Sequence, residues 1–117
     1  MRRTNPDFLN GVPELLILQL LDRRPMHGYD LVQSIRTASQ ERFEFGEGCI
    51  YPLLHRLESQ GCLEGRPEKV GGRKRIVYRV TPAGRKRLAA TVATWTEIVA
   101  GVSSVLQGGT HGRPALA

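Results

Sequence analysis

Residues 48–82 read GCIYPLLHRLESQGCLEGRPEKVGGRKRIVYRVTP, and this stretch decides how the chain folds. From Ile50 to Leu57 apolar residues recur at spacings of three and four, which predicts a helix over about Gly48–Gln60 with one buried stripe. Gly61 is expected to end that helix, because glycine adopts the left-handed conformation there at little cost. The residues that follow alternate as strand residues do, so the stretch predicts a helix followed by a β-hairpin.

The predicted hairpin has strands over Cys62–Glu64 and Arg75–Thr81, joined by a turn over Arg66–Gly72. Its tip holds three consecutive cations: Arg73, Lys74 and Arg75. Adjacent like charges on a tight turn repel each other, so folding stability does not explain them, whereas a phosphate backbone would relieve the repulsion. Because strand residues alternate, the three side chains cannot all point to the same side. A helix beside a cationic β-wing is typical of a winged helix-turn-helix, which predicts binding to DNA.

A second, polar and aromatic face of the predicted helix is expected to meet the DNA. The predicted DNA-binding residues are Gly48, Tyr51, His55, Arg56, Arg73, Lys74 and Arg75. Gly48 either lets the helix N-terminus approach a phosphate closely or only serves the turn. Tyr51 could pack along a sugar or a thymine methyl group, and Arg56 could donate to a guanine edge or a phosphate. His55 either contacts DNA or is a solvated helix residue.

The whole chain is predicted to be mainly α-helical with a small β-wing, an α+β fold. Four segments are expected: a flexible basic arm over 1–9, a winged helix-turn-helix domain over 10–81, a long C-terminal dimerisation helix over 82–107 and a disordered tail over 108–117. Two further helices are predicted within the domain, over Pro13–Asp22 and Tyr29–Ala38. Asn10 and Thr81 are expected to cap the helices that begin near Pro13 and Pro82.

The last helix contains a regular apolar seam. Its members, spaced 4, 3, 4, 3 and 4 residues apart, are Leu88, Val92, Trp95, Val99, Val102 and Leu106. This heptad pattern predicts a helix that pairs with another helix, because a domain this small has little core left to receive the stripe. A homodimer is therefore expected. Trp95, the single tryptophan, lies at the centre of the seam, where it either packs in the dimer interface or borders a slot for a planar aromatic effector.

The composition favours a protein that binds a polyanion and gives no sign of a catalytic function. Seventeen Lys and Arg against eleven Asp and Glu give a formal net charge of +6, which indicates nucleic acid as partner. We expect a cytoplasmic protein that is not an enzyme and needs no metal or cofactor. No export signal, uninterrupted apolar span or metal-ligand spacing stands out. Cys49 and Cys62 are expected to be reduced, and Cys49 is either a thiol switch at the helix start or a small buried filler.

Four motifs together resemble the PadR family of bacterial transcriptional regulators. They are PELLIL at Pro13–Leu18, PMHGYDL at Pro25–Leu31, GCIYPLLHRLE at Gly48–Glu58 and GRKRIVYRVTPAG at Gly72–Gly84. The resemblance covers about residues 11–88, and the combination is specific although each motif alone is weak. It implies a winged helix-turn-helix dimer that usually represses nearby genes and releases DNA when an effector binds. The single C-terminal helix is similar to the compact branch of the family.

The predicted function is accordingly a sequence-specific DNA-binding repressor. Two recognition helices related by a two-fold axis imply a pseudo-palindromic operator with half-sites about one helical turn apart. Two other functions remain open: a winged-helix adaptor whose basic wing meets an acidic protein, and a non-specific nucleoid-associated protein. Binding to specific and random DNA over a range of salt concentrations distinguishes the three.

Overall fold

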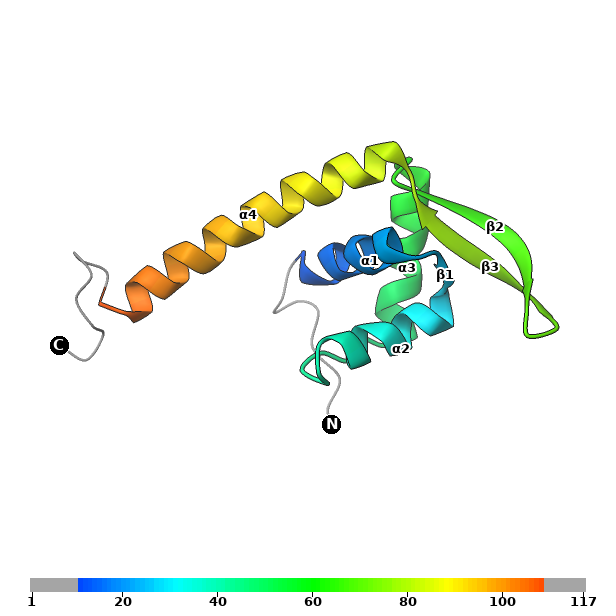
Figure 1. Cartoon of the computed structure of the whole chain (residues 1–117), viewed down its shortest axis with the longest axis horizontal. Helices are drawn as coiled ribbons and strands as arrows, with labels where there is room; N and C mark the ends of the chain where they lie inside the picture. The colour runs from blue at the N-terminus through cyan, green and yellow to red at the C-terminus, as the bar shows by residue number, and fades with distance from the viewer. Residues whose placement is uncertain (1–10, 109–117) are drawn as a thin grey trace.

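A computed structural model describes residues 11–108 of the chain. The expected basic arm, the expected cap Asn10 and the tail from residue 109 onward lie outside the described residues. In chain order the elements are α1 (Val12–Arg23), β1 (Met26–His27), α2 (Gly28–Ala38), α3 (Glu47–Ser59), β2 (Leu63–Val70), β3 (Arg73–Val80) and α4 (Pro82–Leu106). Three helices gather around the base of a small sheet, while the outer part of the sheet and α4 extend away in opposite directions (Figure 1). The predicted α+β winged architecture with a long last helix is confirmed.

Local signals place the helix ends where the sequence predicts them. Pro13 lies in the first turn of α1, which begins after Gly11 in the left-handed region at a φ of 86°. Thr81 caps α4 by accepting a hydrogen bond from the Gly84 backbone N–H at 3.0 Å. Gly61 follows the last turn of α3 with a φ of 78°, as expected of a helix terminator.

The core lies where α1, α2 and α3 meet the base of the sheet. Its fully buried side chains are Ile17, Leu18, Leu31, Ile35, Phe45, Ile50, Leu54 and Leu57. The apolar stripe predicted for α3 accounts for three of them. α3 is therefore anchored by one face, and its other faces are left for other contacts.

The wing is longer than predicted and its turn is tighter. The sheet order is β1-β3-β2, and β2 pairs with β3 in antiparallel register from Leu63↔Val80 to Val70↔Arg73. The turn contains only Gly71 and Gly72, at φ values of 59° and 81°, a conformation that two-residue hairpins require and that glycine supplies. The predicted turn over 66–72 is wrong, because Pro67 is tolerated in β2, an edge strand.

A third strand, β1, has no counterpart in the sequence-based prediction. Its two residues pair with β3 as Met26↔Tyr78 and His27↔Val77. A two-residue strand has no periodicity of its own, so only its tertiary pairing reveals it. β1 fixes the start of α2 against the base of the wing.

α4 is anchored in the core by its first two turns and then passes the beginning of α1, with most of its remaining apolar side chains exposed. Leu88 is 7% exposed and belongs to the core, so its predicted place in a dimer seam is wrong: it packs within its own domain. The later seam residues are exposed, namely Val92, Trp95, Val99, Val102 and Leu106. The seam that is available to another chain therefore begins at Val92.

α4 is also long and apolar enough to cross a membrane by length and composition alone, with a mean hydropathy of 1.3 over its best window. The prediction that no segment approaches such a span considered only uninterrupted apolar runs, whereas α4 reaches this value with polar residues interspersed. Only 6% of that window is buried. Exposed apolar area of this extent is unfavourable in water and is typical of surfaces that interact with another molecule.

Candidate nucleic-acid interface

The N-terminal turn of α3 is open to solvent. Gly46 is the N-cap, and as a glycine it has no side chain to cap the helix. Gly48 is exposed, and nothing lies within 4 Å of the position that a Cβ would occupy there. Its φ is not positive, so the turn does not require glycine for conformational reasons. The helix N-terminus and the open space favour an approaching phosphate, although the Glu47 carboxylate in the same turn opposes it.

Tyr51 connects α3 to the start of α2. Its ring and hydroxyl lie 2.6–2.8 Å from the position that a Cβ would occupy at Gly28, so only glycine permits this approach. The predicted solvent-facing Tyr51 is instead half-buried and packs against the core. Its hydroxyl is thereby held in a fixed place at the junction of α2, α3 and β3.

The electrostatic environment of Tyr51 keeps its hydroxyl protonated. Partial burial raises the pKa of Tyr51, Glu47 raises it further, and Arg75 on β3 lowers it. The effect of Arg75 indicates that this wing cation lies near the tyrosine. A neutral phenol remains able to donate a hydrogen bond to a phosphate oxygen.

His27 has a structural role at the start of α2. Its Nδ1 accepts a hydrogen bond from the Asp30 backbone N–H at 3.3 Å, which makes it the N-cap of that helix. Tyr29, where the predicted second helix begins, is 51% exposed.

His55 and Arg56 diverge although they are adjacent in sequence. His55 is exposed on α3. The Arg56 guanidinium lies 3.5 Å from the Glu14 carboxylate of α1, so it is turned toward α1. The structure thus brings Gly48, Tyr51 and His55 together on α3 but places Arg56 in a different cluster.

The pairing register divides the wing cations between two faces. Arg73 and Arg75 share one face, while Lys74 shares the other with Ile76, as the alternation of strand residues predicts. Glu68 lies opposite Arg75, but its carboxylate accepts from Arg79 at 3.0 Å. Glu68 is thus engaged by Arg79, while Arg73 is exposed and Arg75 is half-buried.

Lys69 is a candidate residue that sequence reasoning missed. It lies directly across from Lys74, and opposed like charges on neighbouring strands are unfavourable for folding. The predicted turn over 66–72 concealed this pairing, since strand register is visible only once the tight Gly71-Gly72 turn is known.

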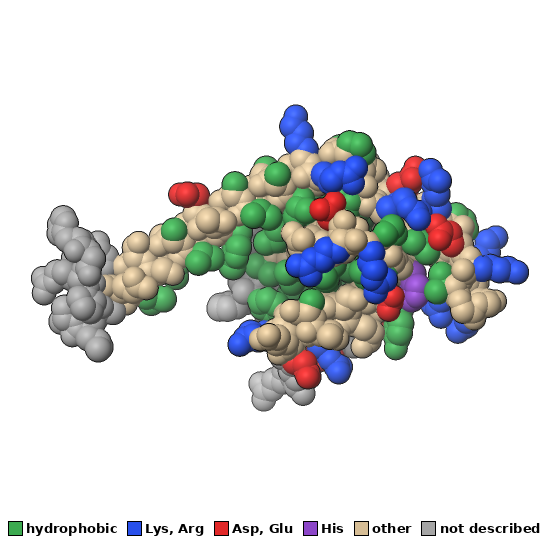
Figure 2. Space-filling view, in the orientation of Figure 1, with side chains coloured by type: hydrophobic (Ala, Val, Ile, Leu, Met, Phe, Trp, Pro, Cys, Tyr) green, Lys and Arg blue, Asp and Glu red, His purple; other side chains and the backbone are tan. Residues whose placement is uncertain are grey.

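Most of the net charge of the chain is concentrated on this hairpin. Between Leu63 and Val80 six Lys and Arg stand against two Glu, which gives +4 of the chain's +6. Figure 2 shows blue basic side chains around the wing. A narrow ribbon with this charge density is suited to a polyanionic groove.

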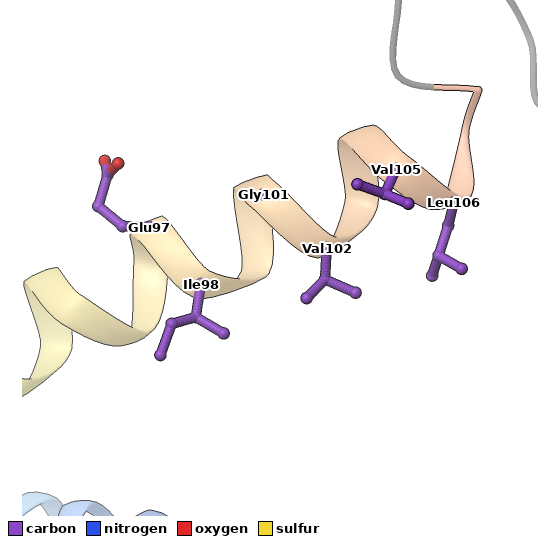
Figure 3. A pocket seen from close by; sticks show the side chains of 6 residues that line it. All are labelled: Glu97, Ile98, Gly101, Val102, Val105 and Leu106. Carbon is purple, nitrogen blue, oxygen red and sulfur yellow. The ribbon is translucent and has the colours of Figure 1, made fainter.

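A different surface dominates the far end of α4. An open apolar patch there is lined by Glu97, Ile98, Gly101, Val102, Val105 and Leu106. Ile98, Val102 and Leu106 point to the same side of the helix, and Glu97 points to the opposite side (Figure 3). The charged and apolar faces of α4 are thus separated.

Trp95 borders a small cavity between α4 and the beginning of α1. The cavity measures about 130 Å³ and is lined by Gly11, Val12, Leu15, Thr91, Thr94, Trp95 and Ile98. Its lining is mainly apolar, and Trp95 itself is 43% exposed. A cavity of about 150 Å³ accommodates one benzene ring, so the space suits a small planar group.

Both cysteines are free thiols; Cys49 is half-buried and Cys62 is buried. Burial raises the pKa of the Cys49 thiol, which opposes the lowering that a helix N-terminus would give. Cys62 is buried beneath the first turn of α4. Cys49 fits the role of a small, partly buried filler. Within residues 11–108 no three His, Cys, Asp or Glu side chains are grouped as metal ligands.

Comparison with known proteins supports the same assignment. Residues 17–90 match the model of the Transcriptional regulator PadR-like family. The chain is 39% identical over 82 residues to the transcriptional regulator Rv3488 of Mycobacterium tuberculosis, covering 70% of this chain and 74% of the relative. These relatives are transcriptional regulators, which confirms the prediction that the chain is not an enzyme.

Solved structures agree in fold over most of the chain. A PadR family transcriptional regulator from Eggerthella lenta is 33% identical, with a TM-score of 0.74 over 86% of this chain and 87% of that one. A PadR-like transcriptional regulator from Bacillus cereus is 29% identical, with a TM-score of 0.76 over 86% of this chain and 97% of that one. Together with the winged architecture and the cationic hairpin, these matches establish that the chain belongs to the PadR-like family of transcriptional regulators.

Proposed function

We propose that this protein is a cytoplasmic, sequence-specific DNA-binding repressor that acts as a homodimer on a pseudo-palindromic operator and releases DNA when a small planar aromatic effector binds. The observation that supports DNA binding most strongly is the adjacency of two surfaces. Tyr51 of α3 packs against Gly28, which directly follows β1, and β1 pairs with β3 of the wing. One duplex can therefore meet the helix and the hairpin together.

The proposed contacts divide into base reading and backbone binding. α3 enters the major groove, where His55 faces the bases. Gly48, in the N-terminal turn of α3, admits a phosphate, and the Tyr51 hydroxyl donates to the backbone. The wing cations bind phosphates or the minor groove: Lys69, Arg73, Lys74 and Arg75. We assign Arg56 to its bridge with Glu14 in place of the predicted base contact.

The proposed dimer forms through the exposed part of α4. Val92, Val99 and Val102 continue a heptad seam that the domain itself leaves uncovered, with Leu106 at its end. The heptad spacing, and a charged residue, Glu97, in the middle of the helix, favour a second helix over lipid as the cover. A two-fold axis between the helices sets the separation of the two DNA-binding surfaces.

The effector is proposed to bind beside Trp95. The cavity between α1 and α4 is apolar and of the size of one aromatic ring, and Trp95 provides a flat wall for stacking. Because this cavity borders the dimerisation helix, a ligand there acts on the element that sets the geometry of the dimer.

The DNA-binding proposal is tested by titrating the protein with its own upstream region and with random duplex, each over a range of salt concentrations. We expect at least about a thousandfold preference for the upstream region at physiological salt. Equal affinity for both duplexes would identify a non-specific nucleoid protein. Failure to bind either would favour an adaptor.

The effector proposal is tested by the fluorescence of Trp95, the single tryptophan of the chain. A set of planar aromatic compounds is screened for quenching, and each active compound is then added to the protein–operator complex. Quenching that coincides with release of DNA supports the proposal. An inducer that releases DNA without changing Trp95 fluorescence contradicts this location for the site.

A further inference from the structure

Arg87, in the second turn of α4, joins three separate parts of the fold. Its Nε and Nη2 atoms donate to the two carboxylate oxygens of Glu14 on α1, both at 3.0 Å. Its Nη1 atom donates to Gln60 Oε1 at 2.7 Å and lies 3.9 Å from Cys62 Sγ. The two parallel bonds to Glu14 match the planar fork of the guanidinium group, a geometry that lysine cannot reproduce.

The partners of Arg87 lie at the end of the recognition helix. Gln60 is the C-cap of α3, and Cys62 directly precedes β2. Glu14 Oε1 is shared, since Arg56 of α3 approaches the same oxygen to 3.5 Å. Glu14 is 14% exposed, so this carboxylate is largely withdrawn from water and is matched by two guanidinium groups. Charge and hydrogen bonding thus connect α4 to α1 and to both the body and the end of α3.

Packing at the base of α4 connects the same parts independently. Thr81 Oγ1 donates to the Gly61 carbonyl oxygen at 2.6 Å, and the Thr81 backbone N–H donates to the Cys62 carbonyl oxygen at 3.1 Å. A Cβ at Gly84 would collide with the Cys62 carbonyl oxygen, so α4 lies directly on the backbone that follows α3. Figure 1 shows the start of α4 beside the end of α3 where β2 begins.

Beyond Leu88, α4 first passes the beginning of α1, where Thr91, Trp95 and Ile98 border a cavity, and then extends past the domain. Its large apolar side chains from Val92 onward are exposed. In the proposed dimer, the position of each recognition helix therefore depends on two joints. One is the α4–α4 pairing, and the other is the joint between α4 and α3 at the base of each subunit. A small rotation at the joint between α4 and α3 becomes a large displacement at the far end of the molecule, which is 60 Å long.

We infer that Arg87 is a positioning residue for operator recognition, which clamps the dimerisation helix to the C-terminal end of the recognition helix and so sets the separation and angle of the two recognition helices. This inference rests on the proposed function. It assigns no DNA contact to Arg87, and it gives Glu14, Arg56 and Gln60 the role of partners in the clamp. Its specific consequence is that Arg87 governs discrimination between operators of different half-site spacing.

The test uses the operator that the wild-type protein selects from a random duplex pool, and two versions with the half-sites one base pair closer and one base pair further apart. We expect the wild type to lose at least about tenfold in affinity on each altered spacing, because a rigid dimer fits one separation. Arg87→Gln is expected to bind the original operator about tenfold more weakly and to lose most of its spacing discrimination. Arg87→Lys keeps the charge without the fork and is expected to fall between the two.

Arg85→Gln is the matched control. Arg85 lies on the same helix and pairs with α1 through Asp22, but the pair is exposed, has a distance of 3.8 Å and does not reach α3. The control removes the same charge and should keep the wild-type spacing discrimination. Dimer mass and cooperative thermal unfolding are measured for every variant.

Each outcome is decisive. Undiminished spacing discrimination in a dimeric, folded Arg87→Gln variant overturns the inference and leaves the proposed function intact. If that variant does not fold, Gln60→Ala removes only the exposed α3 end of the clamp, and unchanged discrimination there overturns the inference equally. If the wild type selects no operator, the proposed function fails and the inference fails with it.

Discussion

Tyr51 illustrates how a side chain of this protein acquires a role from its neighbours. A tyrosine on a helix surface has no fixed partner, but here the absence of a side chain at Gly28 lets the ring lie against α2. Packing immobilises the phenol, and burial raises its pKa, so the hydroxyl is a neutral donor at physiological pH. The hydroxyl group belongs to Tyr51 itself, but its position is set by Gly28, which lies in a different helix.

Tyr51→Phe should weaken operator binding about fivefold, the effect of losing about 1 kcal/mol of hydrogen bonding. The ring remains, so thermal stability should stay close to that of the wild type. Because the pKa of Tyr51 is raised above its ordinary value, the hydroxyl stays protonated from pH 7 to pH 9, and the ratio of the two affinities should not change over that range. Operator titrations at both pH values check this. Equal affinities for the two proteins would show that the hydroxyl makes no contact.

At the scale of elements, the base of α4 and the wing are built by opposite means. α4 joins the domain by close packing, with Gly84 against backbone and Leu88 in the core. The wing extends beyond the helices, and only its base is buried: Leu63, Val77 and Tyr78 anchor it. The base of α4 is held by packing within the domain, whereas the outer part of the wing is exposed and available to bind another molecule.

Two glycines of α4 should respond oppositely to the same substitution. Gly84→Ala should lower the free energy of unfolding by about 1–3 kcal/mol, since the added methyl meets a backbone carbonyl that cannot move aside. Gly101→Ala has open space and should raise it by about 0.5–1 kcal/mol through improved helix propensity. Urea denaturation at a fixed protein concentration measures both. A neutral Gly84→Ala would mean that α4 does not dock on the domain as described.

Neutralising the wing should change the salt dependence of binding more than its sequence preference. For Arg73→Gln with Arg75→Gln, the slope of log affinity against log salt should fall by about 0.9 for each lost phosphate contact. Arg66→Gln is the control, because Arg66 shares the same wing face but is paired with Glu64 at 3.0 Å. An unchanged slope in the double variant would show that the two arginines do not approach the phosphates.

At the scale of the whole molecule, the protein exposes two different binding surfaces at opposite ends of its long axis. One end is a basic hairpin with +4 of the +6 net charge, and the other is an apolar helix with five exposed seam residues. Exposing the apolar helix to water is unfavourable, and salt in the solvent screens the charges of the hairpin. A dimer on DNA satisfies both ends, which is why the proposed assembly accounts for the extended shape.

Val102→Glu should convert the protein to a monomer, since two buried carboxylates would face each other across the seam. Sedimentation at micromolar concentration measures the mass. Operator affinity should fall at least about a hundredfold once the two half-sites bind independently. Glu97→Gln, on the opposite side of α4 (Figure 3), is the control and should remain dimeric. A dimeric Val102→Glu protein would place the interface elsewhere.

The sequence by itself determined the helices, the Thr81 cap, the cationic hairpin and the existence of an apolar seam. These features are local: the apolar stripe of α3, the Thr81 cap and the Gly61 terminator depend on residues only a few positions apart. The four motifs were sufficient for the family as well. What local rules could not provide was the partner of any side chain that is distant in sequence.

Only the tertiary structure decided which of those side chains are free. Leu88 packs in the core and not in the seam, and Arg56 is paired with Glu14. Lys69 lies opposite Lys74, and Arg87 binds Glu14 at a sequence separation of 73 residues. In each case a periodic pattern identifies the face on which a residue lies but not what covers that face. Which residues cover a face depends on how the elements pack. The free energy of burying or pairing a group depends on the groups that surround it as well as on the residue itself.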